Sequence, residues 1–457
     1  MTTTTEDPLI ARMTAAIAGL RGTFPLGRVQ AAGGAVIAAR GLAPSARLGD
    51  RARVGATLLA EVVRIADDLV HLLPEGAADG VSVGDPVRLL GAPVFAPDDS
   101  WIGRVIDPDG LPIDGRPLLP GLMPRAIRAL PPPAQDRRAM GSRLGTGYPV
   151  FDTLLPLARG QRIGLFAGSG VGKSTLLAGF ARGVEADVIV IGLVGERGRE
   201  LRHFVEEVLG PDGMARSVVI AATSDRAPQT RRRAALAATA VAEHFRDQGR
   251  QVLLVIDSVT RFAEAHRELS VAAGEAAALR GFPASTGGAI AALCERAGPG
   301  YGAAGDITAI YSVLVAGSDM EEPVADMLRG VLDGHVVLDR TIAERGRFPA
   351  VDVLRSVSRA LPQAASAAEN ALIAEARRHL GAHDRSALMI RAGLYVAGTD
   401  PEVDVAIATY PALERFLALR QSASTGHSFA ALRQALSHPR APRTKAPTER
   451  GSATDRA

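Results

Sequence analysis

Residues 161–175 read QRIGLFAGSGVGKST, and the fold of the chain can be inferred outward from this segment. Its apolar run, 163–166, is typical of a buried strand, and a glycine-rich turn follows it. From Lys173 onward, apolar residues recur at the spacing of a helix. A strand, a glycine-rich turn and a helix in this order predict a loop that binds phosphate. The alternative, a glycine-rich loop without a ligand, leaves this order unexplained.

The residue types in this loop suit contacts with a nucleotide. Gly168, Gly170 and Gly172 allow a tight turn and a close approach of backbone N–H groups to phosphate oxygens. Lys173 is expected to reach the β- and γ-phosphates, and Ser174 to bind Mg²⁺, the cofactor expected with ATP as substrate. The residues predicted to bind the nucleotide here are Ala167, Gly168, Ser169, Gly170, Val171, Gly172, Lys173, Ser174 and Thr175. Ala167 stands where the usual pattern begins with glycine. Its methyl group is tolerated wherever the backbone φ is negative.

Length and composition limit the class of protein. The 457 residues exceed one ordinary core, so two or three domains are expected. The 52 basic and 49 acidic residues leave a net charge of +3, which provides no broad basic surface for nucleic acid. The single cysteine, Cys294, excludes an intramolecular disulfide, and no leader or bilayer-length apolar run is evident. A cytoplasmic protein is therefore expected.

The amino-terminal segment, 1–23, carries an amphipathic pattern over residues 8–21. Its predicted apolar face consists of Leu9, Ile10, Met13, Ala16, Ile17 and Leu20. Periodicity alone leaves open whether this face packs on its own domain or on a partner.

The rest of the chain divides by composition into four segments. Short Val- and Leu-rich runs between turns predict a small β-barrel over 24–92. Apolar runs alternating with helical stretches predict a mostly parallel sheet covered on both faces over 93–362. An Ala-, Leu- and Arg-rich pattern predicts a helical domain over 363–438, and the polar tail 439–457 is expected to be disordered. The breaks expected between helices of this domain lie at Gly381, Gly398, Pro401 and Pro411.

Two carboxylates are expected beside the phosphate loop. Asp257 ends the apolar run 251–257, which would hold it next to Ser174, where its charge can act on Mg²⁺ through water. Glu196 follows the run 187–194, and a carboxylate at the carboxyl end of such a strand points into the ligand crevice. Glu196 is therefore the candidate that polarises the attacking water. The alternatives are a helix cap for Asp257 and a helix-dipole contact for Glu196.

Longer runs of the chain resemble one family. They are GLFAGSGVGKST, GLVGERGRE, AATSDRAPQTRR, IDSVTRFAEAHREL, SDMEEPVADMLRGVLDGHVVLDR, RFPAVDVLRSVSR and YVAGTDPEVDVAI. In sequence and in order along the chain, these motifs are similar to those of the flagellar protein-export ATPase, a relative of type III secretion ATPases and of the catalytic subunits of rotary ATP synthases. The resemblance covers roughly residues 24–420. It implies an α/β fold, namely a RecA-like, mostly parallel P-loop NTPase core between an N-terminal β-barrel and a C-terminal helical domain.

The resemblance also implies roles for single residues of the core. Glu196 matches the family's catalytic carboxylate, and Lys173 and Ser174 match the residues that bind phosphate and magnesium. Arg197 and Arg261 match arginines near the catalytic centre and the γ-phosphate.

Two further roles rest on the resemblance alone. Phe348, in RFPAVD, matches an aromatic residue that stacks on adenine, and Arg359, in SVSR, matches an arginine donated to the neighbouring subunit's nucleotide. Without the resemblance, core packing and a surface arginine would be the ordinary interpretations. The sequence of the chain departs from the family's usual sequence in segments 147–157 and 280–298. Segment 280–298 is expected near a central pore.

The resemblance implies an ATPase that forms a homo-oligomeric ring, expected to be a hexamer, and energises flagellar type III protein export. The implied partners are a stator-like regulatory protein on the N-terminal helix, export-gate components, exported flagellar proteins and their chaperones. No nucleic acid is expected, and the protein would reach the inner-membrane export apparatus only through partners. The phosphate-loop sequence GSGVGKS favours the flagellar system over a virulence injectisome.

Two other functions receive less support. A non-catalytic ring subunit would lack the carboxylate at Glu196. An RNA translocase would require aromatic residues for base stacking in the barrel, where residues 24–92 contain no Tyr or Trp and only Phe24.

Overall fold

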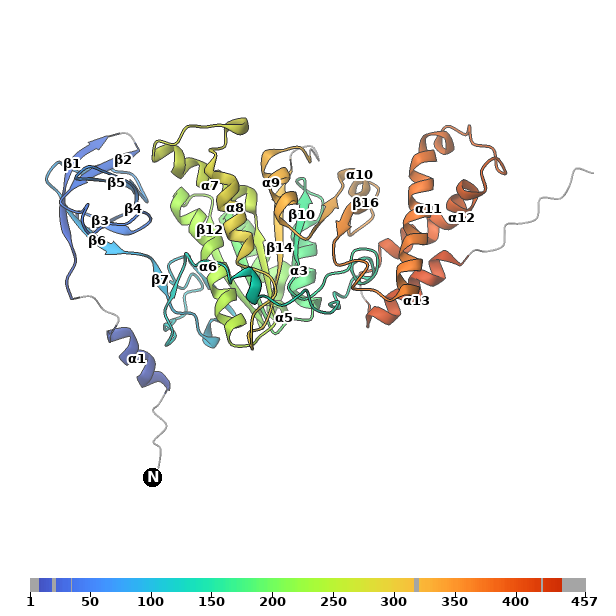
Figure 1. Cartoon of the computed structure of the whole chain (residues 1–457), viewed down its shortest axis with the longest axis horizontal. Coiled ribbons are helices and arrows are strands. Elements are labelled where there is room, and N and C mark those ends of the chain that lie inside the picture. Colours follow the sequence, from blue (N-terminus) through green and yellow to red (C-terminus); the bar gives the residue numbers. More distant parts are fainter. Residues whose placement is uncertain (1–7, 19–21, 34, 316–319, 421, 438–457) are drawn as a thin grey trace, which may run out of the picture.

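A computed structural model describes residues 8–18, 22–33, 35–315, 320–420 and 422–437. A small barrel, a central sheet domain and a group of long helices follow one another along the molecule (Figure 1). This arrangement confirms the predicted fold class. The tail 439–457 and Leu20 lie outside the described residues. In the described part of the chain, no helix has the length and apolar character needed to cross a membrane.

The barrel closes in the order β1-β2-β5-β4-β3-β6. Its strands are β1 (Leu26–Gly33), β2 (Val36–Arg40), β3 (Arg51–Val54), β4 (Leu58–Ala66), β5 (Leu69–Pro74) and β6 (Pro86–Gly91). Alternate side chains point inward, so that Val29, Ile37, Val70 and Leu72 fill the interior. Helix α1 (Pro8–Ala18) precedes the barrel, and residues 19–21 of the predicted helix 8–21 lie outside the described residues.

An eight-stranded sheet forms the centre, in the order β16-β15-β10-β14-β13-β11-β12-β8. Its strands are β8 (Arg104–Ile106), β10 (Arg162–Ala167), β11 (Val188–Glu196), β12 (Ser217–Thr223), β13 (Val252–Asp257), β14 (Ile307–Leu314), β15 (Gly334–Leu338) and β16 (Val351–Ser358). The pairings are parallel except between β15 and β16. Strand β8 was not predicted, because three residues in a turn-rich stretch show no period. The short strands β7 (Val94–Phe95) and β9 (Arg125–Ala126) pair separately.

Helices cover both faces of this sheet and create two apolar cores. They are α2 (Pro149–Asp152), α3 (Lys173–Gly183), α4 (Gly198–His203), the π-helix η3 (Phe204–Leu209), α5 (Gly210–Met214), α6 (Pro228–Asp247), α7 (Val259–Ala272), α8 (Ser285–Glu295), α9 (Pro323–Val331) and α10 (Arg340–Glu344). Short 3₁₀ turns are η1 (Asp99–Trp101), η2 (Ala134–Asp136) and η4 (Leu279–Gly281). Because both faces are covered, β10, β11, β13 and β14 are almost continuously apolar, as the sequence predicted, whereas the edge strand β16 carries polar and exposed residues.

The carboxyl-terminal helices are α11 (Ala367–Arg391), α12 (Pro401–Leu417) and α13 (Thr425–Leu436). The break predicted at Gly381 is wrong, since this residue lies inside α11. The break predicted at Pro411 is also wrong, since α12 continues through it. A single glycine costs a helix only about 1 kcal/mol, and a proline removes one backbone hydrogen bond, so packing between α11 and α12 can retain both helices.

A buried group of ion pairs joins the barrel to the sheet domain. Glu61 of β4, whose side chain is 4% exposed, accepts hydrogen bonds from Arg128, Arg232 and Arg233. Arg233 also pairs with Glu75 at 3.1 Å. Because Arg232 and Arg233 belong to α6, these contacts hold the barrel on the helix that covers β11 and β12.

We predict that Glu61→Ala lowers the free energy of unfolding by about 3 kcal/mol, because it leaves buried guanidinium groups without their carboxylate. Asp68→Ala is the control, since the Arg40–Asp68 pair is 61% exposed on both sides and its removal should cost under about 1 kcal/mol. Denaturant titration of each variant measures the difference. Equal losses would show that the Glu61 group does not stabilise the fold.

Candidate functional site

The predicted phosphate loop joins β10 to α3 at the carboxyl edge of the sheet. Gly170 (φ 78°) and Gly172 (φ 84°) adopt the left-handed conformation, and Gly172 is the N-cap of α3. Gly168 does not, and a Cβ added there would lie 3.6 Å from the Val315 carbonyl oxygen, an ordinary contact. The turn thus requires two of the three glycines. It directs the amino end of α3 toward the loop, which suits an anion.

Lys173 and Asp257 meet at this edge although they lie far apart in sequence. The Lys173 ammonium forms an ion pair with Asp257 Oδ1, and both side chains are largely buried. Asp257 ends β13, and Lys173 begins α3 after β10, with only β14 between the two strands. The structure therefore brings these two predicted site residues together at one edge of the sheet.

Glu196 reaches the same site through an irregularity in β11. Gly195 has φ 71°, and the pairing with β12 shifts by one residue between Val194 and Glu196. The backbone is fixed after this bulge, because Ser224 N–H donates to the Glu196 carbonyl oxygen at 2.9 Å. A bulge next to a site commonly redirects a side chain. Here it accompanies the carboxylate predicted to act on water.

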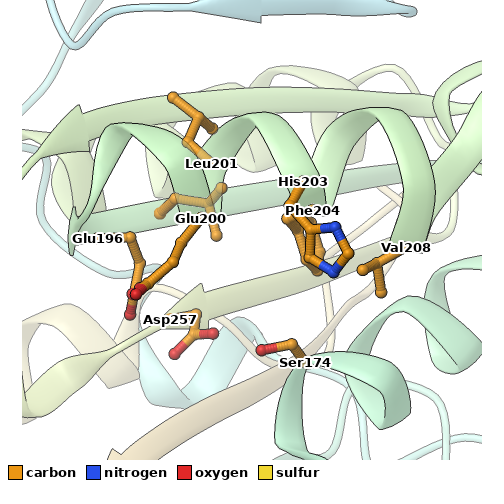
Figure 2. Close-up of a pocket in the computed structure, with 9 residues that line it drawn as sticks. Ser174, Glu196, Glu200, Leu201, His203, Phe204, Val208 and Asp257 are labelled. Atoms are coloured by element: carbon orange, nitrogen blue, oxygen red, sulfur yellow. The ribbon is translucent and has the colours of Figure 1, made fainter.

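A cavity of about 140 Å³ lies between these residues (Figure 2). Its walls are formed by Ser174, Leu193, Glu196, Glu200, Leu201, His203, Phe204, Val208 and Asp257. Glu196 and Glu200 lie together on one side, with Asp257 and Ser174 below them (Figure 2). Sequence reasoning missed Glu200; its position four residues after Glu196, at the start of a helix, was the available signal.

The surroundings of Glu196 raise its pKa to about 7. Burial is the largest cause, because it disfavours the charged carboxylate. The negative charge of Asp257 and a hydrogen bond to Glu200 act in the same direction, whereas Lys173 opposes them. A carboxylate whose pKa lies near neutrality suits a group that accepts a proton during catalysis.

The side chains around this cavity fit Mg²⁺ bound together with a nucleotide. The described residues contain no group of three or more His, Cys, Asp or Glu side chains placed to hold a metal by themselves. Ser174 supplies a hydroxyl and Asp257 a carboxylate at the cavity wall. Mg²⁺ commonly takes few protein ligands, retains water and completes its shell with phosphate oxygens. Ser174 and Asp257 are therefore the residues that would hold it.

The two arginines expected near the catalytic centre point to carboxylates of their own helices. Arg197 is 67% exposed and lies 3.7 Å from Glu200. Arg261 Nη1 donates to Glu264 at 2.9 Å. A Cβ added to Gly195 would lie 3.5 Å from both Cβ and Cγ of Arg261, so this arginine lies beside the Glu196 bulge. Its Nε is buried and has no hydrogen-bond partner among the described residues, leaving a donor for an anion.

Phe348 lies beside Gly172, where the phosphate loop ends and α3 begins. A Cβ added to Gly172 would lie 3.2 Å from the Phe348 ring, so the aromatic ring covers the start of α3. The Arg420 guanidinium lies over this ring at 5.9 Å, and its Nε donates to the Phe348 carbonyl oxygen at 3.4 Å. Arg420 follows α12, so the helical domain contributes to the surroundings of the ring where adenine is expected.

Arg359 lies far from the phosphate loop of its own chain. It follows Ser358, which pairs with Gly334 at the start of β15, whereas Ala167 of β10 pairs with Leu338 at its end. The intervening stretch of β15 corresponds to about 13 Å of strand. Arg359 is exposed and lies beyond the opposite end of the sheet. The structure therefore does not bring Arg359 together with Glu196 and Lys173 in one chain.

Two family models match the chain. The nucleotide-binding domain of the ATP synthase alpha/beta family matches residues 147–358, and the T3SS EscN ATPase C-terminal domain matches residues 365–438. The chain belongs to the flagellar and type III secretion ATPase family. Its membership confirms the resemblance inferred from the motifs.

Curated relatives and solved structures support the same family membership. The flagellum-specific ATP synthase of Caulobacter vibrioides is 44% identical over 90% of this chain and 95% of its own length. The type 3 secretion system ATPase of Pseudomonas syringae pv. tomato is 42% identical, covering 86% and 89% of the two chains. The assembled ATPase EscN from enteropathogenic E. coli matches with a TM-score of 0.84 at 38% identity, over 90% of this chain and all of EscN as solved.

We predict that kcat/KM for ATP hydrolysis rises between about pH 6 and pH 8, with an apparent pKa near 7. Glu196 must be ionised to accept a proton, and its raised pKa leaves much of it protonated below that value. Glu200→Gln removes a neighbouring negative charge, so the acid limb should move to lower pH. Steady-state rates across this range test both points. A flat profile in the parent protein would contradict Glu196 as the proton acceptor.

Proposed function

We propose that this protein hydrolyses ATP, with Glu196 orienting and deprotonating the attacking water. The observation that supports this proposal most strongly is the half-buried Glu196 carboxylate, with its pKa near neutrality, across one cavity from Ser174 and Asp257. A non-catalytic ring subunit would have no need for a carboxylate tuned in this way.

The chain's own residues divide the work of binding and catalysis. Backbone N–H groups of 168–172 and the amino end of α3 bind the β- and γ-phosphates, and Lys173 leaves Asp257 to join them. Ser174 and, through water, Asp257 would hold Mg²⁺, which would neutralise charge on the phosphate oxygens. Arg261 supplies positive charge from beside Gly195. Phe348 stacks on the base.

Lys173→Ala and Glu196→Gln should separate binding from turnover. We expect Lys173→Ala to weaken ATP binding by at least about tenfold, because a buried charged donor to phosphate is lost. Glu196→Gln keeps the size of the side chain and should preserve binding while turnover falls by about 10²–10⁴. Nucleotide titration and phosphate release measure the two effects. Parental turnover in Glu196→Gln would exclude Glu196 as the catalytic carboxylate.

Assembly into a ring, proposed to be a hexamer, would bring Arg359 to a neighbouring subunit. In a single chain, Arg359 lies at the opposite end of the sheet from the phosphate loop and is exposed. Because charge develops on the γ-phosphate oxygens, an arginine supplied in trans typically contributes about 10³–10⁵ in rate. The similarity to assembled EscN supports an oligomer of this kind.

Mixed rings test this arrangement. Arg359→Ala and Glu196→Gln subunits should each be inactive alone, whereas a mixture creates some interfaces with an intact Glu196 and an intact Arg359. We expect the mixture to recover measurable ATP hydrolysis. Labelled subunits should first show that rings form and exchange. Exchange without any recovery would mean that the two residues do not act across one interface.

We further propose that hydrolysis energises flagellar type III protein export and the unloading and unfolding of its substrates. Relatives that carry the name flagellum-specific ATP synthase are 42–45% identical to the chain, and the Pseudomonas syringae secretion ATPase is 42% identical. Export through a virulence injectisome is thus the second candidate. The proposed partners are export-gate components, exported flagellar proteins and their chaperones, with peripheral association at the inner membrane through them.

Helix α1 is proposed to bind a stator-like regulatory protein. Arg12 anchors the helix to the sheet domain by donating to the Leu119 and Pro120 carbonyl oxygens, and it pairs with Asp98 at 3.3 Å. The apolar side chains remain outside, with exposures of 49–66%, at Leu9, Ile10, Met13 and Ile17. An anchored helix with its apolar face in solvent favours the partner interpretation over packing within its own domain.

Removing residues 1–21 should abolish co-purification with that partner while the remaining protein stays folded and hydrolyses ATP. The apolar face contributes to no core of the described chain, so its loss should hardly change the free energy of unfolding. Pull-down and thermal unfolding are the two measurements. Met13→Glu offers a point variant on the exposed face. If the partner binds equally well to both variants, another surface carries the contact.

A further inference from the structure

Asp257 Oδ1 receives two donors. One is the Lys173 ammonium, and the other is the Ser312 hydroxyl, which donates at 2.6 Å. Ser312 belongs to β14, the strand next to β13, and follows Tyr311, which pairs with Ile256. Neighbouring positions on adjacent strands thus place Ser312 beside Asp257. Its side chain is fully buried.

Because Ser312 is buried, its hydrogen bond to Asp257 is strong. A hydroxyl that donates to an ionised carboxylate forms a strong, short bond, and no bulk water competes with it here. The bond fixes Oδ1 and therefore limits rotation of the carboxylate. The Asp257 carboxylate lines the cavity together with Ser174 (Figure 2).

Other buried serines of the same sheet make different contacts. The Ser217 hydroxyl donates to the Gly213 carbonyl oxygen at 2.7 Å, and the Ser356 hydroxyl donates to the Asp352 carbonyl oxygen. These bonds satisfy a buried hydroxyl with backbone. Ser312 instead donates to a carboxylate that faces the proposed metal site.

We propose that Ser312 is a positioning residue for Mg²⁺: it holds the Asp257 carboxylate in the orientation that the metal's water shell requires. The proposal rests on the proposed function, in which Lys173 leaves Asp257 for the phosphates. Once Lys173 has moved, Ser312 is the remaining side-chain donor to Oδ1 among the residues that the structure describes. The hydroxyl contacts neither the nucleotide nor the metal and acts only through Asp257.

Ser312→Ala in the full-length protein tests the inference. ADP binding is titrated calorimetrically at stepped Mg²⁺ concentrations and again in EDTA. We expect the Mg²⁺ concentration for half-maximal tightening of ADP binding to rise about tenfold, the cost of one lost hydrogen bond to a charged group. ADP affinity in EDTA should change less than about twofold, because Ser312 does not contact the nucleotide. Ser312→Cys retains a weaker donor of similar size and should fall between Ser312→Ala and the parent.

Ser217→Ala is the matched control, since it removes a fully buried hydroxyl from the same sheet, remote from the cavity. It should leave the Mg²⁺ requirement unchanged, and thermal unfolding should show that all variants are folded. Equal shifts for Ser312→Ala and Ser217→Ala, or an equal loss of ADP affinity with and without Mg²⁺, would overturn the proposal. If the parent binds Mg²⁺ with ADP but does not hydrolyse ATP, the proposed function fails while this metal test still applies.

Discussion

The ion pair between Lys173 and Asp257 joins the two segments on which the rest of the site depends. Lys173 begins the helix after β10, and Asp257 ends β13, so the pair forms only if the parallel strands run in the observed order. Glu196 ends β11 on the other side of β13. The carboxyl ends of neighbouring parallel strands therefore bring Lys173, the proposed metal ligand Asp257 and the proposed proton acceptor Glu196 to one edge. A shift in strand register would separate them.

Ion pairs connect the barrel and the helical domain to the elements that surround this edge of the sheet. The barrel is held on α6 by the carboxylate of Glu61, and α6 packs on β11, the strand that carries Glu196. On the other side, Arg347 and Glu414 pair at 3.1 Å and connect the Phe348 segment to α12. The proposed adenine contact, Phe348, is thus tied to the helical domain, while Arg359, proposed to act on a neighbouring subunit, is exposed on its own chain. This division suggests a site that one chain begins and a second chain completes.

Most of the fold could be predicted, because its signals are local or strongly periodic. The strands that end at Glu196 and Asp257 are continuous apolar runs, and the glycines before Lys173 mark the turn. The tertiary contacts could not be predicted. Nothing near Ser312 indicates a bond to Asp257, since β14 lies next to β13 only through the sheet order. Pro411 also misled the prediction, because a helix packed against α11 tolerates a proline that local chemistry disfavours.

The central claim is that the catalytic site is completed between chains, and the dependence of ATPase activity on protein concentration tests it most directly. Sedimentation at each concentration gives the assembled fraction, and phosphate release gives the rate. The account predicts that the rate per chain is low while monomers dominate and rises in proportion to the assembled fraction, whereas nucleotide affinity stays nearly constant. A rate per chain that is already maximal in monomers would contradict it.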